Sequence, residues 1–110
     1  MILLSDQKTL KLLGLAKRAN KLVTGEDAVI NLLKQNKLKI VFVASDASLK
    51  QKDKFEKKCF FYKTQLNNNY TCDELSSAVG KPMCKILGVT DQGFTDALNK
   101  SLNGGANNEG

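Results

Sequence analysis

The stretch KIVFVA, residues 39–44, decides the fold class of this chain, because its last five residues are all apolar. An uninterrupted run of β-branched and aromatic residues is typical of a strand that is buried on both faces of its sheet. The residues SDAS, 45–48, predict a turn, and Ser48 with Gln51 has the spacing of a capping box that opens a helix through about Phe60. A buried strand that leads directly into a helix indicates an α/β protein.

Upstream of this strand the sequence predicts two helices and a short strand. Ser5 is placed to cap a first helix, and the strand KLVT, residues 21–24, leads into a second helix over residues 25–35. Asn20 and Asn36 follow the two helices, and asparagine tolerates the left-handed conformation that ends many helices. The residues expected on the buried faces are Thr9, Leu12, Leu13, Ala16 and Ala19 in the first helix, and Ala28, Val29, Leu32 and Leu33 in the second.

Downstream of the buried strand the alternation continues. The predicted elements are a strand over residues 61–66, a turn over 67–69, a helix over 72–79, a loop over 80–83, a strand over 85–89 and a last helix after Asp91. Thr71 with Glu74 has the spacing of a second capping box, and Asp91 is expected to cap the last helix. Phe94, Ala97, Leu98 and Leu102 form the expected buried face of that helix.

Strands that alternate with helices predict a three-layer α/β/α sandwich around a four-stranded, mixed sheet. The length of 110 residues fits one domain, which we place at residues 1–102. The ending NGGANNEG, residues 103–110, is rich in glycine and asparagine and is expected to be a disordered tail.

The composition excludes several classes of protein. There is no histidine, and the three cysteines are widely spaced, so neither a disulfide framework nor a metal site is expected and the thiols should be reduced and buried. No apolar run is long enough to cross a bilayer, and the N-terminus lacks the basic start of a signal peptide. We therefore expect a cytoplasmic protein without cofactor or membrane partner.

The positive charge is unevenly distributed along the chain. Residues 1–58 contain 13 Lys/Arg against 6 Asp/Glu, whereas residues 59–110 contain 4 against 5. A positive field of this kind favours polyanions such as nucleic acid. Charge by itself supports solubility equally well, so both interpretations stay open at this point.

Catalytic candidates are weak. Asp46 and Asp91 both follow predicted strands, where α/β sheets often bind ligands, but capping of the next helix explains each of them better. The sequence has neither a phosphate-binding GxxxxGK loop nor a dinucleotide-binding GxGxxG motif, and no nucleophile stands beside a plausible base. A small-ligand enzyme built on these two aspartates is therefore the weakest of the three hypotheses that we consider, after the two binding functions described below. We predict that the chain is not an enzyme.

The stretch VTGED, residues 23–27, is the most informative candidate site. Thr24 is placed as the cap of the second helix with Asp27 as its capping-box partner, and Gly25 permits another backbone or a nucleic acid to approach closely. The free amides at a helix start favour an anion. Glu26 and Asp27 either complement the helix dipole or accept hydrogen bonds from the edge of a guanine.

Five segments in a fixed order resemble one known group of proteins over about residues 3–102: LGLAKRANKLVTGEDAV, KIVFVASDAS, KKCFFY, ELSSAVGKP and VTDQGF. They resemble the YlxQ-type bacterial proteins, which belong to the superfamily of the L-seven-Ae and L-thirty-e ribosomal proteins. The resemblance implies an α/β/α sandwich that binds kink-turn RNA. It implies that sheared G·A pairs lie against the start of the second helix, and that apolar residues of the loop Gly80-Lys81-Pro82-Met83 contact a flipped-out nucleotide.

The superfamily reads RNA with the motif G-x-N-E-x-x-K, and this chain departs from it. Gly25 matches the glycine, but Asp27 takes the Asn position, Ala28 the Glu position and Asn31 the Lys position. Asp27 accepts hydrogen bonds from guanine but cannot donate to a guanine carbonyl, and Ala28 makes no polar contact. Glu26 lies one residue before the Asn position, in the same first turn, as a candidate for the missing acid.

Basic residues near this helix in the sequence complete the predicted interface. Lys17, Arg18, Lys21, Lys34 and Lys37 are candidates for phosphate contacts, which provide affinity without specificity. The leading hypothesis is a monomeric, non-enzymatic protein that binds structured RNA of the kink-turn type, with ribosomal RNA as one candidate, and not DNA. The alternative is a protein-interaction adaptor that has lost specific RNA readout.

Overall fold

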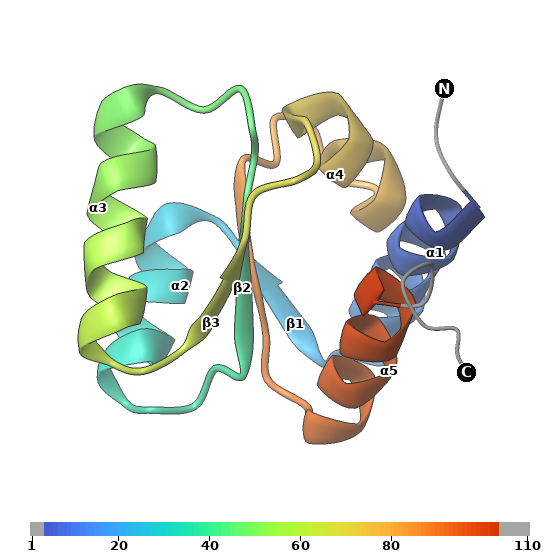
Figure 1. Cartoon of the computed structure of the whole chain (residues 1–110), viewed down its shortest axis with the longest axis horizontal. Coiled ribbons are helices and arrows are strands. Elements are labelled where there is room, and N and C mark those ends of the chain that lie inside the picture. The colour runs from blue at the N-terminus through green and yellow to red at the C-terminus, as the bar shows by residue number, and fades with distance from the viewer. Residues whose placement is uncertain (1–3, 104–110) are drawn as a thin grey trace.

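The computed structural model describes residues 4–103, which form a three-layer α/β/α sandwich (Figure 1). Its elements are α1 (Leu4–Arg18), β1 (Leu22–Thr24), α2 (Glu26–Lys34), β2 (Ile40–Val43), α3 (Leu49–Phe61), β3 (Gln65–Asn67), α4 (Cys72–Val79), β4 (Ile86–Val89) and α5 (Gln92–Asn103). The predicted fold class is confirmed. The predicted tail lies outside the described residues, apart from Asn103, which ends α5.

The four strands form one mixed sheet in the order β1-β4-β2-β3. β4 is antiparallel to β1 and to β2, whereas β2 and β3 are parallel. β1, β2 and β3 therefore all run in one direction and β4 runs in the other. All four residues of β2 are buried, as the apolar run predicted, because helices cover both faces of the sheet at this position.

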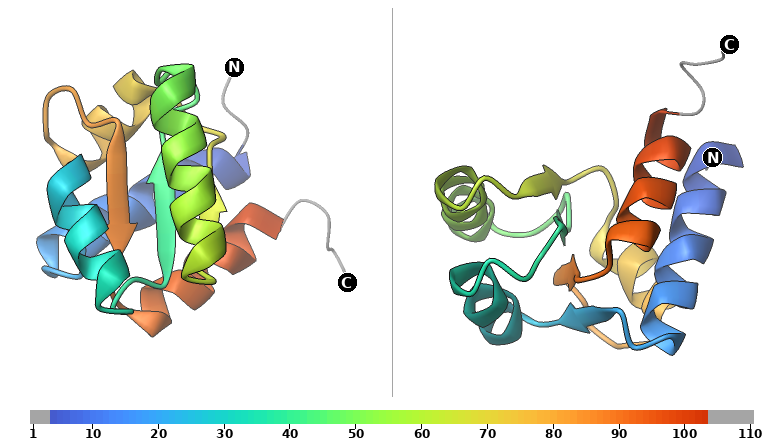
Figure 2. Two further views of the ribbon diagram at one scale, coloured as in Figure 1. Left: turned by 90° about the vertical axis from the view of Figure 1, so that its left-hand side faces the viewer. Right: turned by 90° about the horizontal axis from the view of Figure 1, so that it is seen from below.

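Three helices cover one face of the sheet and two cover the other. α1, α4 and α5 lie on one side, and α2 and α3 lie on the opposite side (Figures 1 and 2). Each layer contributes large, fully buried side chains, including Leu13 of α1, Leu33 of α2, Phe42 of β2, Phe55 of α3 and Leu98 of α5. α1 and α5 also share a buried polar contact, in which the hydroxyl oxygens of Thr9 and Ser101 lie 2.7 Å apart.

Most predicted helix ends are confirmed. The Ser48 side chain accepts a hydrogen bond from the Gln51 amide, and Thr71 with Glu74 forms a complete capping box. The Asp91 carboxylate accepts from the Phe94 amide at 2.8 Å, which caps the start of α5. The left-handed ends are also present, since the backbone φ angle is 61° at Asn20 and 57° at Asn36.

Three local predictions are wrong. Helix α1 begins at Leu4, so Ser5 lies inside its first turn and is not its cap. The segment predicted as a strand over residues 61–66 is mostly not a strand, because α3 extends to Phe61 and β3 begins only at Gln65. Ala19 and Ala28, both expected to be buried, are exposed. Alanine is apolar but small, so its place in an apolar pattern says little about which way it faces.

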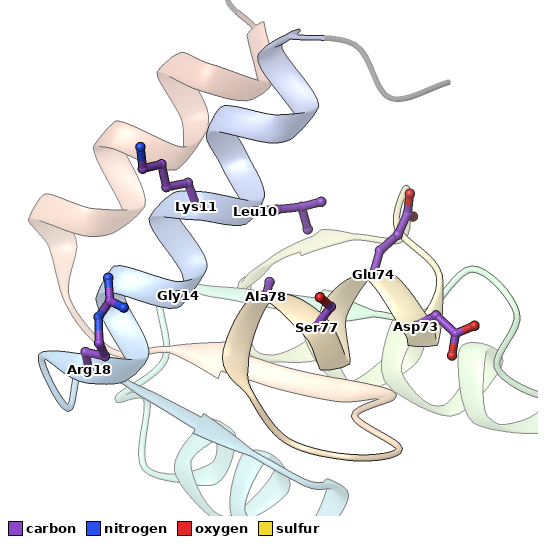
Figure 3. Close-up of a pocket in the computed structure, with 8 residues that line it drawn as sticks. All are labelled: Leu10, Lys11, Gly14, Arg18, Asp73, Glu74, Ser77 and Ala78. Atoms are coloured by element: carbon purple, nitrogen blue, oxygen red, sulfur yellow. The ribbon is translucent and has the colours of Figure 1, made fainter.

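Gly14 sets the distance between α1 and α4. A Cβ atom at this position would lie 2.7 Å from the backbone carbonyl oxygen of Ala78, closer than atoms of this kind can approach. Figure 3 shows α1 passing α4 at this point, with Ala78 beside Gly14. Within residues 4–103 no helix has both the length and the apolar character needed to cross a membrane.

We expect Gly14→Ala to destabilise the protein by about 1–3 kcal/mol, because the new methyl group must push α1 away from α4. Helix propensity acts in the opposite direction and favours alanine by about 1 kcal/mol. Urea unfolding of the variant and of wild type measures the difference, with the exposed Ser77→Ala as the control. Unchanged or increased stability of Gly14→Ala would contradict this account of the contact.

The three cysteines are free and buried, and burial raises the pKa of the Cys59 thiol to about 11. We expect all three thiols to resist an aromatic disulfide reagent at mildly alkaline pH in the folded protein and to react at once in concentrated guanidinium chloride, because the reagent needs an accessible thiolate. The released chromophore counts the reactive thiols. Rapid modification of Cys59 in the folded state would show that α3 opens more easily than its packing indicates.

Candidate functional site

The start of α2 is an uncapped helix N-terminus. Its N-cap is Gly25, with φ 97° and ψ 150°, and no side chain accepts a hydrogen bond from the helix amides there. Thr24 is the last residue of β1, so the predicted capping box of Thr24 and Asp27 is wrong. The reason is that the Gly25 amide donates to the Ile86 carbonyl at 2.9 Å, which continues the pairing of β1 with β4 and delays the helix by one residue.

Gly25 also leaves the space in front of the helix open. Its positive φ is one that L-residues rarely adopt, and a Cβ atom built on Gly25 would meet no other atom within 4 Å. The conformation therefore requires glycine, while the surroundings leave room for a ligand. Exposed amides at such a position can donate to a phosphate or to a base.

The two acids of the first turn have different environments. Glu26 accepts a hydrogen bond from the Lys54 ammonium at 2.6 Å and another from the Gln51 side chain at 3.1 Å, both from α3. Both hydrogen bonds lower the pKa of Glu26, and the bond from Lys54 has the larger effect. Asp27 is exposed. The structure thus directs Glu26 toward α3, and Asp27 is the acid that faces solvent.

The solvent-facing side of α2 carries the motif positions. Asp27, Ala28 and Asn31 are all exposed, while Val29 and Leu33 are buried against the core. Residues three and four apart lie on one side of a helix, so Asn31 follows directly behind Asp27 and Ala28. The exposure of Ala28, which contradicts the apolar pattern, agrees with its alignment to the glutamate of the RNA-reading motif.

The loop between α4 and β4 lies at the same end of the sheet. Gly80 ends α4 with a left-handed φ of 70°, and Lys81, Pro82 and Met83 are exposed, Met83 to 74% with φ 55°. Because β4 begins just after this loop and its first residue binds the Gly25 amide, the loop lies next to the start of α2 (Figure 2). The structure therefore brings together the helix start and the loop.

The predicted phosphate-binding residues lie elsewhere. Lys21 precedes β1, and its carbonyl accepts from the Thr90 amide beyond the far end of β4. Lys17 and Arg18 end α1 just before it, and Lys34 is the last residue of α2, which is nine residues and so about 13 Å long. These basic residues are at the opposite end of the sheet from Gly25, although they are close to it in sequence.

Other cations stand near the start of α2. Lys54 of α3 binds Glu26 in the first turn, and Lys81 belongs to the loop itself. Lys54 was missed because it lies on α3, 28 residues after Glu26 in the chain. The run KQKDK at the start of that helix was the available signal.

The structure does not bring the two candidate catalytic aspartates together. Asp46 follows β2 and Asp91 follows β4, and since these strands are antiparallel the residues lie at opposite ends of the sheet. Asp46 accepts from the Cys72 amide at 2.9 Å, and Asp91 caps α5. The groove in Figure 3, about 460 Å³ between α1 and α4, is lined by neither aspartate.

Comparison with known proteins agrees with the resemblance seen in the sequence. The model of the "Ribosomal protein L7Ae/L30e/S12e/Gadd45 family" matches residues 7–99. The RNA-binding protein YlxQ of Enterococcus faecium is 39% identical over 98 residues, which cover 89% of this chain and 94% of that protein. The protein of the same name from Bacillus subtilis (strain 168) is 37% identical and covers 86% of this chain and 95% of its own length.

Solved structures show the same fold. A protein of unknown function from Bacillus halodurans C superposes with a TM-score of 0.83 at 34% identity and covers 87% of this chain and 97% of its own. The Giardia lamblia 15.5kD RNA binding protein superposes with a TM-score of 0.76 over 94% of this chain and 88% of its own, and at 10% identity this likeness concerns the fold alone. With a family model that matches most of its length, the chain belongs to the ribosomal protein L7Ae/L30e/S12e/Gadd45 family.

Proposed function

We propose that this protein binds structured RNA through the start of α2 and the loop Gly80-Lys81-Pro82-Met83. The observation that carries the proposal is the uncapped N-terminus at Gly25, where open space and free amides meet the exposed side of α2. Relatives at 37–39% identity are named RNA-binding proteins, which supports RNA as the ligand. The function is binding, without a catalytic step.

Each part of this surface has a defined chemical task. The first amides of α2 donate to RNA oxygens, and Asp27 accepts from the imino and amino groups of a guanine. Pro82 and Met83 offer an apolar surface to an unpaired base, since both side chains are exposed, that of Met83 to 74%. Glu26 plays a supporting part, because its bonds to Lys54 and Gln51 connect the first turn of α2 to α3.

The RNA class we propose is the kink-turn, in which a sharp bend presents guanines and a flipped-out nucleotide together. The paired arrangement of helix start and loop fits both features. Ala28 and Asn31 supply fewer polar contacts than the glutamate and lysine of the superfamily motif. We therefore propose a kink-turn binder of reduced affinity that acts in the cytoplasm on ribosomal or other structured RNA.

We expect wild type to bind a kink-turn RNA more tightly than a plain duplex of equal length at low salt, and Gly25→Glu to weaken that binding at least tenfold. The glutamate fills the open space and repels the phosphate backbone. Because Gly25 has a positive φ, circular dichroism must show that the variant is folded. Asn31→Glu, at an exposed helical position, adds the same charge without backbone strain and should weaken binding as well.

The matched control for charge is Asn103→Glu at the exposed end of α5, which should bind like wild type. Fluorescence anisotropy of labelled RNA gives the affinities. Equal binding of kink-turn and duplex, or an undiminished affinity of Asn31→Glu, would be evidence against the proposed site.

Restoring the superfamily motif should strengthen binding. The triple variant Asp27→Asn/Ala28→Glu/Asn31→Lys recreates G-x-N-E-x-x-K on the exposed side of α2, and all three positions tolerate polar residues because they face solvent. One good bidentate base contact is worth about 1–3 kcal/mol, so we expect roughly tenfold or greater gain for kink-turn RNA and little gain for duplex. An equal gain for both RNAs would assign the effect to charge alone.

A further inference from the structure

The topology collects basic residues at the end of the sheet opposite the start of α2. β1, β2 and β3 all begin there, and α1, α2 and α3, which precede these strands, all end there. We call this region the basic end and define it by six exposed residues: Arg18, Lys21, Lys34, Lys37, Lys39 and Lys63. They come from three segments of the chain, namely the connections from α1 to β1, from α2 to β2 and from α3 to β3.

Within residues 4–103, no carboxylate forms a salt bridge with any residue of the basic end. The described ion pairs instead use Lys54 with Glu26 and Lys57 with Asp53. Asp91, an acid at this end, is engaged in capping α5. The cations of the basic end are therefore available to an external anion.

Two of the most exposed aromatic residues of the protein lie at the same end. Phe60 is 87% exposed and Phe61 is 75% exposed, in the last turn of α3. The Phe61 ring packs edge-on against the half-buried Tyr62, with ring centroids 4.9 Å apart, which restricts its motion. Neighbouring phenylalanine rings that are this exposed do not contribute to the core, so packing does not explain them.

The cations and the rings are close in space. β2 and β3 are adjacent parallel strands, with Ile40 paired to Gln65, so the backbone before β2 at Lys39 lies beside the turn before β3 at Lys63. That turn is tied to the aromatic pair, because the Lys63 amide donates to the Phe60 carbonyl at 3.2 Å. Figure 2, seen from below, shows the ends of α2 and α3 side by side at this end of the molecule.

Helix dipoles account for only part of this arrangement. A lysine in the last turn of a helix is favourable, which gives Lys34 a structural role. Lys37, Lys39 and Lys63 lie beyond the helices and Phe60 and Phe61 are apolar, so the dipole explains none of them. Proteins hold single-stranded nucleic acid with exposed aromatic rings beside a positively charged surface, and both are present at this end of the sheet.

We propose that the basic end is a second RNA-binding surface, for a single-stranded segment whose bases stack on Phe60 and Phe61 and whose phosphates contact Lys37, Lys39 and Lys63. Charge complementarity favours a polyanion over a protein partner, because the cations of the basic end outnumber the acids near the rings, which include Glu56 one turn before Phe60, and none of these cations forms a described salt bridge. The proposal rests on the chain being an RNA-binding protein, but not on the site at the start of α2.

The test uses a fluorescently labelled oligouridylate of about ten nucleotides, within the span that single-strand binders cover. Stacking on an aromatic side chain is worth about 1–3 kcal/mol per base, so Phe60→Ser/Phe61→Ser should weaken oligouridylate binding roughly tenfold or more. Lys37→Glu/Lys39→Glu should also weaken it and should reduce its dependence on salt. The control is Leu49→Ser, which removes an 82% exposed apolar side chain from the other end of α3.

Testing each variant against both RNAs distinguishes the two proposed surfaces. Phe60→Ser/Phe61→Ser should bind kink-turn RNA like wild type, and Asn31→Glu should bind oligouridylate like wild type. Unchanged oligouridylate binding by the phenylalanine variant, or an equal loss in Leu49→Ser, overturns the proposal whatever happens at the α2 site. Failure of wild type to bind oligouridylate at low salt also overturns it.

Sedimentation of wild type and of the phenylalanine variant tests an alternative role for Phe60 and Phe61, which is a contact between two copies of this chain. If wild type dimerises and the variant is monomeric while oligouridylate binding is unaffected, the rings form a contact between copies of this chain and the RNA proposal is overturned. Monomeric sedimentation of both proteins, together with lost oligouridylate binding in the variant, supports it.

Discussion

The antiparallel pairing of β4 with both β1 and β2 is the constraint on which the rest of the structure depends. Hydrogen bonds on both edges of β4 oblige β1 and β2 to run in the same direction, and β3 joins them in parallel. The turns into α2 and α3 therefore lie at one end of the sheet and the ends of these helices at the other. The same ladder continues to Gly25, whose amide binds Ile86 and so fixes where α2 begins.

Features that depend on local interactions could be predicted from the sequence. The apolar run of β2 identified a strand covered on both faces, and the capping side chains of Ser48, Thr71 and Asp91 occupy the places that their spacing predicted. In these cases the partner atom is three residues away in the chain. The short range leaves few alternatives, which is why pattern and structure agree.

Features that depend on pairing between distant segments could not be predicted in the same way. The sequence places Lys21 and Lys34 near Gly25, but strand direction and helix length carry them to the other end of the sheet. Asp46 and Asp91 were separated by the same antiparallel pairing. Thr24 had a suitable side chain for a cap, yet the pairing of β1 with β4 keeps it in the strand, a contact between residues about 60 apart that no local pattern reveals.

The ion pair of Lys54 with Glu26 affects how strongly RNA binding at the start of α2 should depend on salt, compared with RNA binding at the basic end. A lysine already paired with a carboxylate neutralises RNA phosphates poorly and so releases few of the counterions condensed on the RNA, which means that RNA binding beside it is strengthened little by dilution of the buffer. The cations of the basic end form no described salt bridge, so RNA binding there should be strengthened more by dilution. For the two RNA surfaces proposed above, a dilute buffer should therefore favour binding at the basic end over binding at the start of α2.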